Sequence, residues 1–150
     1  MIYGDLDGLK QINDRFGHAE GSRAISRIAA VLKNTFRTSD VVSRLGGDEF
    51  AILAGKVRSE EKDILIGRLE DNLRTESDQS AHGYPLSLSV GAVWVAHDSS
   101  LTVDQLIVAA DTTMYDRKRI RKQMSNQAGL KPPAYPLSTD EAIGLRPDAV

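Results

Sequence analysis

The stretch SRLGGDEFAIL, residues 43–53, places two glycines and two acids between two segments that have the apolar content of β-strands. The flanking segments are DVVSRL at 40–45 and EFAIL at 49–53. The doublet Gly46-Gly47 suits a tight turn with a positive φ at both positions. The pattern therefore predicts a β-hairpin with Asp48 and Glu49 beside its turn, although taken alone it also fits a plain turn with solvated acids.

The rest of the chain alternates between strand and helix patterns. A strand is predicted at residues 2–6, which places Asp5 at its carboxyl end. The other predicted elements are a short helix at 9–16, a helix from 20 to 37 or 38, a helix at 60–74 that begins at Ser59, the longest strand at 86–95, and a helix after a capping box at 102–105. This order predicts an α+β fold with a mainly antiparallel sheet and helices packed on it.

Composition limits the kinds of protein that this chain can be. Its 150 residues fit one domain, it has no cysteine, and its apolar runs are shorter than the ~20 residues of a membrane span. We therefore expect a cytoplasmic domain without disulfides. The net charge of -2 gives no general attraction to a nucleic acid polymer. Prolines and glycines interrupt every pattern after 127, so 1–127 is the expected domain and 128–150 a proline-containing linker or disordered tail.

Three acids come near one another if strands 2–6 and 49–53 are neighbours in one sheet. Asp5, Asp48 and Glu49 would then lie at the same edge. Carboxylates without nearby histidine or cysteine suit Mg²⁺ or Mn²⁺, and magnesium held by few carboxylates usually completes its shell with phosphate oxygens. Glycines let a phosphate approach the backbone. A nucleoside triphosphate is the ligand that these residues suggest.

Four ordered blocks resemble the GGDEF family of diguanylate cyclases. They are DLDGLKQINDRFGHAEG at 5–21, RTSDVVSRLGGDEFAIL at 37–53, LSLSVGA at 86–92 and AADTTMYDRK at 109–118. The resemblance covers residue 2 to about residue 122. It implies a nucleotidyl-cyclase palm fold with a ferredoxin-like core and a mainly antiparallel five-stranded sheet surrounded by helices. It also implies that two GTP molecules are condensed into cyclic di-GMP and two pyrophosphates where two domains face each other, so a homodimer is the expected catalytic unit.

The resemblance assigns the metal and catalytic roles by position. Asp5 and Asp48 would hold the metals, with the carbonyl of Leu6 beside them. Glu49 would be a metal ligand or help to activate the ribose 3′-hydroxyl. Two-metal phosphoryl chemistry needs mainly positioning and charge neutralisation from the protein, which is the work that acids of this kind do.

The substrate-binding positions implied by the resemblance each have a simpler interpretation as well. Gly46 and Gly47 would admit the phosphates, and Lys118 and Lys122 would bind them, but cations also suit the end of any helix. Asn13 matches the residue that hydrogen-bonds guanine, although an asparagine there also fits a helix end.

Two further positions concern product and base recognition. Arg37 and Asp40 have the spacing of the family's inhibitory RxxD site for cyclic di-GMP, and otherwise fit a surface ion pair. Ser22 stands where the family usually has an aspartate that pairs with guanine. In addition, IRKQ replaces the usual SGRN after the last helix, and the chain begins at the first strand without the family's lead-in helix.

The sequence leaves three functions open. The first is a diguanylate cyclase within a larger sensor protein whose upstream region, membrane-bound or not, supplies dimerisation and input. The second is a catalytically silent GGDEF module that binds GTP or cyclic di-GMP and regulates a partner domain. The third is a structural remnant that supports a neighbouring domain and has neither property.

Overall fold

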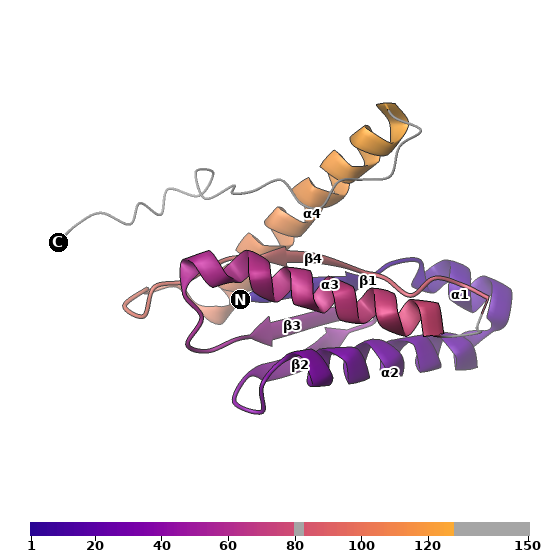
Figure 1. Ribbon diagram of the computed structural model, residues 1–150, viewed down its shortest axis with the longest axis horizontal. Coiled ribbons are helices and arrows are strands. Elements are labelled where there is room, and N and C mark those ends of the chain that lie inside the picture. The colour runs from indigo at the N-terminus through magenta and orange to yellow at the C-terminus, as the bar shows by residue number, and fades with distance from the viewer. Residues whose placement is uncertain (80–82, 128–150) are drawn as a thin grey trace.

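The computed structural model describes residues 1–79 and 83–127, which form an α+β fold built on one sheet (Figure 1). In chain order the elements are β1 (Ile2–Leu6), α1 (Leu9–Phe16), α2 (His18–Thr35), β2 (Val41–Gly46), β3 (Glu49–Leu53), the 3₁₀ helix η1 (Ser59–Glu61), α3 (Lys62–Gln79), β4 (Leu88–Ala92) and α4 (Val103–Gln127). Among these described helices, none is long and apolar enough to cross a bilayer.

The sheet has the strand order β2-β3-β1-β4, and each neighbouring pair is antiparallel. β1 is thus a central strand, paired on one side with β3 and on the other with β4. The α+β class and the antiparallel sheet expected from the sequence are confirmed. Within residues 1–79 and 83–127 the sheet has four strands rather than the five that the family resemblance implies. The residue pattern itself predicted four strands in these ranges, and all four belong to this sheet.

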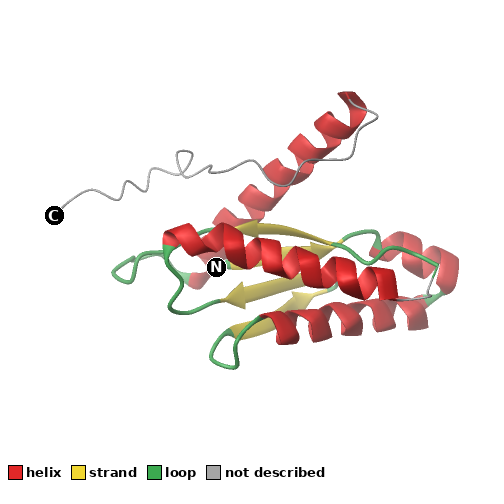
Figure 2. Ribbon diagram, in the orientation of Figure 1, coloured by secondary structure: helices red, strands yellow, loops and turns green. Residues whose placement is uncertain are grey.

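Helices cover both faces of the sheet (Figure 2). Side chains alternate along β1, so that Ile2 and Leu6 enter a core shared with α2 and α3, whereas Tyr3 packs against α4 on the opposite face. The larger core draws residues from most elements, among them Ile12, Ile28, Leu32, Phe50, Ile52, Ile66, Leu69 and Val90. In Figure 1, α3 passes in front of the sheet and α4 emerges from behind it and projects beyond it.

Helix α4 lies unusually close to β4. A Cβ atom added at Gly91 would overlap the backbone carbonyl oxygen of Ala110 and the backbone nitrogen of Met114, so the helix rests directly on the glycine. The helix also has the predicted capping box. The Thr102 amide donates to Gln105 Oε1 at 2.8 Å, and the Gln105 amide donates to Thr102 Oγ1 at 3.3 Å.

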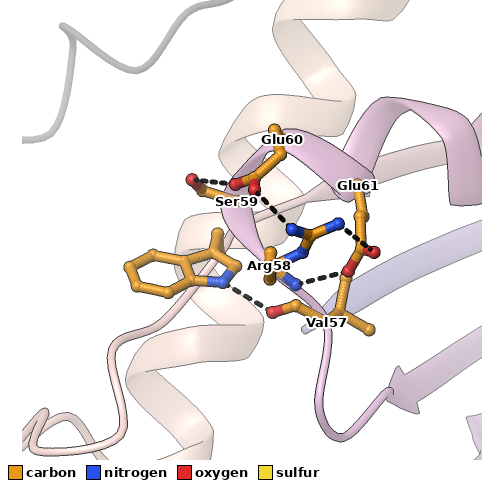
Figure 3. Close-up of polar contacts among 6 residues, drawn as sticks. Val57, Arg58, Ser59, Glu60 and Glu61 are labelled. Carbon is orange, nitrogen blue, oxygen red and sulfur yellow. Dashed lines mark hydrogen bonds and ion pairs between the residues drawn. The ribbon is translucent and has the colours of Figure 1, made fainter.

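The segment that leads into α3 is held by polar contacts (Figure 3). The Arg58 amide donates to Glu61 Oε2 at 2.9 Å, and the indole Nε1 of Trp94 donates to the Val57 carbonyl at 2.8 Å. A helical start at Ser59 is confirmed, with the 3₁₀ turn η1 before α3.

Two predicted helices have different ends in the structure. α3 continues to Gln79, five residues beyond the expected end at 74, because polar contacts support a turn that has no apolar pattern: Glu76 pairs with Arg27, and Ser77 Oγ accepts a hydrogen bond from the Leu86 amide at 3.0 Å. α2 runs from His18 to Thr35, so it begins and ends about two residues earlier than expected.

The segment at 86–95 is not the longest strand, as the sequence suggested. β4 has five residues and β2 has six. The strand is limited by its partner, because β1 offers only Ile2 to Leu6 for pairing, in register with Ala92 to Leu88. Backbone hydrogen bonds continue just outside the paired region, from Val93 to Met1 and from Asp7 to Ser87.

Candidate functional site

Sheet pairing brings the predicted acids to one edge. Asp5 at the end of β1 lies directly opposite Glu49 at the start of β3, and the Leu6 amide donates to the Asp48 carbonyl at 2.9 Å. The expectation that these strands are neighbours is therefore confirmed. In the described part of the chain, however, no three acidic or histidine side chains are close enough together to form a ready-made cation site.

The hairpin turn differs from the prediction by one residue. Gly47 and Asp48 form the turn, whereas Gly46 still belongs to β2 and pairs with Glu49. Only Gly47 of the doublet has a positive φ, 49°, because a register shift between Arg44 and Gly46 absorbs the other glycine into the strand. A Cβ at Gly46 or Gly47 would meet nothing within 4 Å, so the space above both backbones is open.

Arg44 fixes the conformation of this turn. Its Nε and Nη2 atoms both donate to the Gly47 carbonyl, at 3.0 and 2.6 Å. The two bonds tie the Gly47 carbonyl to a side chain of β2. Arg44 is a residue that sequence reasoning did not select, although its place three residues before Gly47 is the signal that could have found it.

Lys118 supplies the positive charge next to the acids. Its Nζ lies 2.6 Å from Asp5 Oδ1 and 3.7 Å from Asp7 Oδ1, and its side chain is 38% exposed. The lysine comes from α4, which packs on β1 and β4 and thus reaches the end of β1. The side chain of Lys122, the other predicted phosphate ligand, lies outside the described residues.

Asp7 is a member of the site that the sequence analysis missed. Its carboxylate accepts hydrogen bonds from Ser87 Oγ at 2.9 Å and from Ser89 Oγ at 2.6 Å. The signal was the repeated spacing of two in Asp5-Leu6-Asp7 and in Ser87-Leu88-Ser89, which brings both pairs to the ends of adjacent strands. These bonds hold the β1–α1 connection, in which Gly8 has φ 72° and no side chain caps the start of α1.

Tyr3 contacts Glu49 on the face of the sheet that α4 covers. Its hydroxyl donates to Glu49 Oε1 at 2.5 Å, and the residue is 6% exposed and packs against Ala110 and Met114. Burial raises the pKa of Tyr3, and the hydrogen bond to Glu49 and the negative charges nearby raise it further. The phenol therefore remains a hydrogen-bond donor at neutral pH. Sequence reasoning missed this residue because a tyrosine in a strand is usually only a core residue.

Asn13 and Ser22 lie together on the helical pair that follows β1. A Cβ at Gly21 would overlap Asn13 Oδ1, so the amide of Asn13 rests against the backbone next to Ser22. Ser22 is exposed at the start of α2, and its carbonyl accepts a hydrogen bond from Ser26 Oγ at 3.0 Å. The two predicted base-recognition residues are thus brought close to each other.

Arg37 and Asp40 lie in the loop between α2 and β2, away from the acids. Asp40 accepts hydrogen bonds from the amides of Arg37, at 2.9 Å, and Gly55, at 3.1 Å. Its carboxylate therefore joins this loop to the segment after β3. The side chain of Arg37 is exposed and, in the part of the chain that the structure describes, makes no ion pair with Asp40.

An antiparallel sheet with helices on both faces and an acidic hairpin beside the end of its central strand defines a domain of the nucleotidyl-cyclase type. The family model described as "Diguanylate cyclase, GGDEF domain" matches residues 1–124. The chain belongs to this GGDEF family, as the sequence resemblance indicated.

Individual relatives agree with this assignment. The diguanylate cyclase TpbB of Pseudomonas aeruginosa is 32% identical over 99% of this chain, but the match covers 34% of TpbB. The chain thus spans about a third of the length of that relative. A solved EAL/GGDEF domain protein from M. capsulatus superimposes with a TM-score of 0.68 at 32% identity, covering 79% of this chain and 77% of the other. A microbial GGDEF domain, solved in a study of its interaction with cyclic di-GMP, has a TM-score of 0.60 at 30% identity and covers 79% and 71%.

Proposed function

We propose that this chain is the catalytic domain of a diguanylate cyclase, which condenses two GTP into cyclic di-GMP and two pyrophosphates across a homodimer. The observation that carries the proposal is the pairing of Asp5 with Glu49 beside the Gly47-Asp48 turn, with Lys118 bound to Asp5. These residues form half of a phosphoryl-transfer site, and a second copy of the chain facing the hairpin would supply the other half. In the whole protein we place the domain in the cytoplasm, within a larger sensor.

The donor atoms at this edge suit Mg²⁺ or Mn²⁺. The carboxylates of Asp5, Asp48 and Glu49 and the carbonyl of Leu6 are hard oxygen ligands, and the chain has no cysteine to offer a thiolate. The ammonium of Lys118, 2.6 Å from Asp5, is a cation in the place where a metal would bind. A metal bound there would neutralise the triphosphate and polarise the α-phosphate for attack by the 3′-oxygen of the facing GTP.

The chain's own groups then have separate roles. Lys118 would exchange its contact with Asp5 for phosphate oxygens if Asp5 held a metal, and its ammonium would then neutralise phosphate charge. The triphosphate would lie over the open backbone at Gly46 and Gly47 and beside the start of α1, which has no side-chain cap and whose amides favour an anion. Lys122 contributes to the same phosphates. Glu49 binds the metal or receives the proton of the 3′-hydroxyl.

Base recognition falls to Asn13 and Ser22. An asparagine amide both donates and accepts, so Asn13 can bond to guanine, while the Ser22 hydroxyl offers one neutral contact. The weaker partner at position 22 predicts a modest preference for GTP over ATP.

Arg37 and Asp40 form the proposed product site. An exposed guanidinium can bind a phosphate with two hydrogen bonds and stack on or bond to guanine. The hydrogen bonds of Asp40 fix the loop that presents Arg37. Occupation of this loop by cyclic di-GMP would limit accumulation of the product.

The other candidate is a silent module that binds GTP or cyclic di-GMP and regulates a partner domain, and Ser22 favours it because the base contact is weakened. Nucleotide binding and nucleotide turnover, measured on the same preparation, separate the possibilities. Cyclic di-GMP made from GTP and Mg²⁺ establishes the enzyme. Tight binding without turnover establishes the module, and the absence of both leaves a structural remnant.

A further inference from the structure

We propose that Tyr3 is a positioning residue for Glu49, which it holds in a single orientation with one carboxylate oxygen directed away from the reaction. This inference rests on the proposed function, since it assigns a role in the same site. The Tyr3 hydroxyl donates to Glu49 Oε1 at 2.5 Å, and within the described residues this is the only hydrogen bond to that carboxylate.

The two residues are unequal in their freedom to move. Glu49 is exposed at the start of β3, so its side chain has no packing of its own to fix a rotamer. Tyr3 is 6% exposed and is packed against Ala110 and Met114 of α4. A rigid donor therefore sets the position of a mobile carboxylate, and not the reverse.

Strand register explains why the contact reaches Glu49. Asp5 lies directly opposite Glu49, and Tyr3 lies opposite Ala51, so Tyr3 and Glu49 are diagonal neighbours on one face. Long side chains reach each other across such a diagonal. β1 thus presents two groups to Glu49 on that face, the carboxylate of Asp5 and the phenol of Tyr3.

The contact favours one oxygen of Glu49 over the other. With Oε1 bonded to the phenol, Oε2 keeps both of its lone pairs for a metal or for the 3′-hydroxyl, so Glu49 acts mainly through Oε2. Groups that hydrogen-bond to a metal-binding carboxylate typically alter metal affinity or activity by roughly 10- to 100-fold when they are removed. Helix α4 packs against Tyr3 and also carries Lys118, which contacts Asp5. The position of this one helix therefore affects both Glu49 and Asp5.

The test replaces Tyr3 by phenylalanine, which keeps the ring and removes the donor. We expect the Kd for Mn²⁺, measured by electron paramagnetic resonance on the nucleotide-free chain, to rise about tenfold. In a cyclase assay kcat should fall by a similar factor, while KM for GTP changes less than about twofold because the phenol touches neither base nor triphosphate. Tyr84→Phe is the matched control, since it also removes a tyrosine–glutamate hydrogen bond, to Glu20 at 2.8 Å, and it should leave Mn²⁺ affinity unchanged.

A double-mutant cycle separates positioning from a general effect on the fold. If Tyr3 acts through Glu49, Tyr3→Phe should have no further effect on Mn²⁺ affinity in a Glu49→Ala background. Unchanged Mn²⁺ affinity in Tyr3→Phe, or an equal loss with and without Glu49, would overturn the inference. An unaltered chain whose Mn²⁺ affinity depends on Tyr3 through Glu49 but which makes no cyclic di-GMP would refute the proposed activity alone, whereas one that binds no Mn²⁺ with or without GTP would refute both.

Discussion

At the residue scale, the two neighbouring acids of the hairpin have different surroundings. Asp48 occupies the turn, where its carbonyl accepts the Leu6 amide, whereas Glu49 begins a strand and is held by Tyr3. The backbone of Asp48 thus serves the fold while its carboxylate projects from the turn. Asp48 and Glu49 are neighbours in the sequence, which does not distinguish their two environments, because both environments depend on contacts with β1.

Asp48→Ala should abolish cyclase activity and leave the fold intact. In the described structure the side chain makes no hydrogen bond or ion pair, and only the backbone carbonyl of Asp48 contributes a contact to the fold. Loss of a metal ligand removes several kcal/mol of transition-state stabilisation, so the rate should fall roughly a thousandfold. Product chromatography measures the rate and thermal unfolding checks the fold. Normal turnover with normal metal dependence would show that Asp48 holds no metal.

Ser22→Asp should strengthen recognition of guanine. An aspartate accepts charge-assisted hydrogen bonds from N1 and the 2-amino group, and the gain over a neutral hydroxyl is on the order of 1 kcal/mol. KM for GTP should therefore fall several-fold, and the preference for GTP over ATP should widen. Competition kinetics with both nucleotides provide the measurement. If the parent already binds GTP at micromolar concentration and the substitution gives no gain, Ser22 is not at the base.

At the element scale, α4 is the helix on which the site depends. It rests on Gly91 of β4, packs on Tyr3 and brings Lys118 to Asp5. The position of this helix relative to the sheet therefore controls both the cation beside Asp5 and the donor beside Glu49.

Gly91→Ala should destabilise the domain and impair the site together. The new Cβ would overlap backbone atoms of α4, and forcing the helix away costs about 2 kcal/mol or more. Gly67→Ala is the matched control, because a Cβ there meets nothing within 4 Å and a helical alanine gains about 1 kcal/mol. Urea unfolding of both variants gives the two free energies. Equal stability of Gly91→Ala and the parent would mean that the helix does not rest on the glycine.

The α2–β2 loop gives a separate prediction. Arg37→Ala should weaken binding of cyclic di-GMP at least tenfold with little loss of stability, since a bidentate charged contact contributes ~1.5–3 kcal/mol and the guanidinium is exposed. Calorimetry on Arg37→Ala and on Arg74→Ala, an exposed arginine of α3, measures the difference. Asp40 is a poorer probe because its carboxylate also holds the loop. Equal affinity of Arg37→Ala and the parent would leave Arg37 as an ordinary surface residue.

The sequence predicted most of the elements and the pairing of the strands that carry Asp5 and Glu49, but it could not predict the exact side-chain contacts. Apolar patterns located β1, α2 and β3, and Asp5 and Glu49 were expected at one edge on the condition that β1 and β3 are neighbours, which the structure confirms. The turn was predicted one residue too early, at Gly46-Gly47 rather than Gly47-Asp48. Both glycines can adopt a positive φ, and only the register between β2 and β3 decides which of them does so. The contacts of Tyr3 and Lys118 join segments that are 46 and 113 residues apart, which no local pattern specifies.

At the scale of the whole molecule, the proposed site is half of a symmetric arrangement. The acids, the open glycine turn and Lys118 all lie at one edge of one domain, and cyclic di-GMP contains two guanosines joined by two equivalent bonds. In the proposed reaction one copy of the chain holds one GTP, and both bonds form when two copies face each other. The rate of the proposed reaction should consequently depend on dimerisation of the chain. We propose that regions such as those of the larger relatives that lie outside the match control this dimerisation.

Formation of cyclic di-GMP from GTP is the activity that a diguanylate cyclase domain must show. The chain, fused to a parallel dimeric coiled coil to enforce dimerisation, is incubated with GTP and Mg²⁺, and the nucleotides are separated by chromatography. We expect cyclic di-GMP and pyrophosphate in a ratio of one to two, no product after chelation of the metal, and none from the Asp48→Ala dimer. A folded, metal-loaded dimer that leaves GTP unchanged would contradict the assignment of this chain as a diguanylate cyclase.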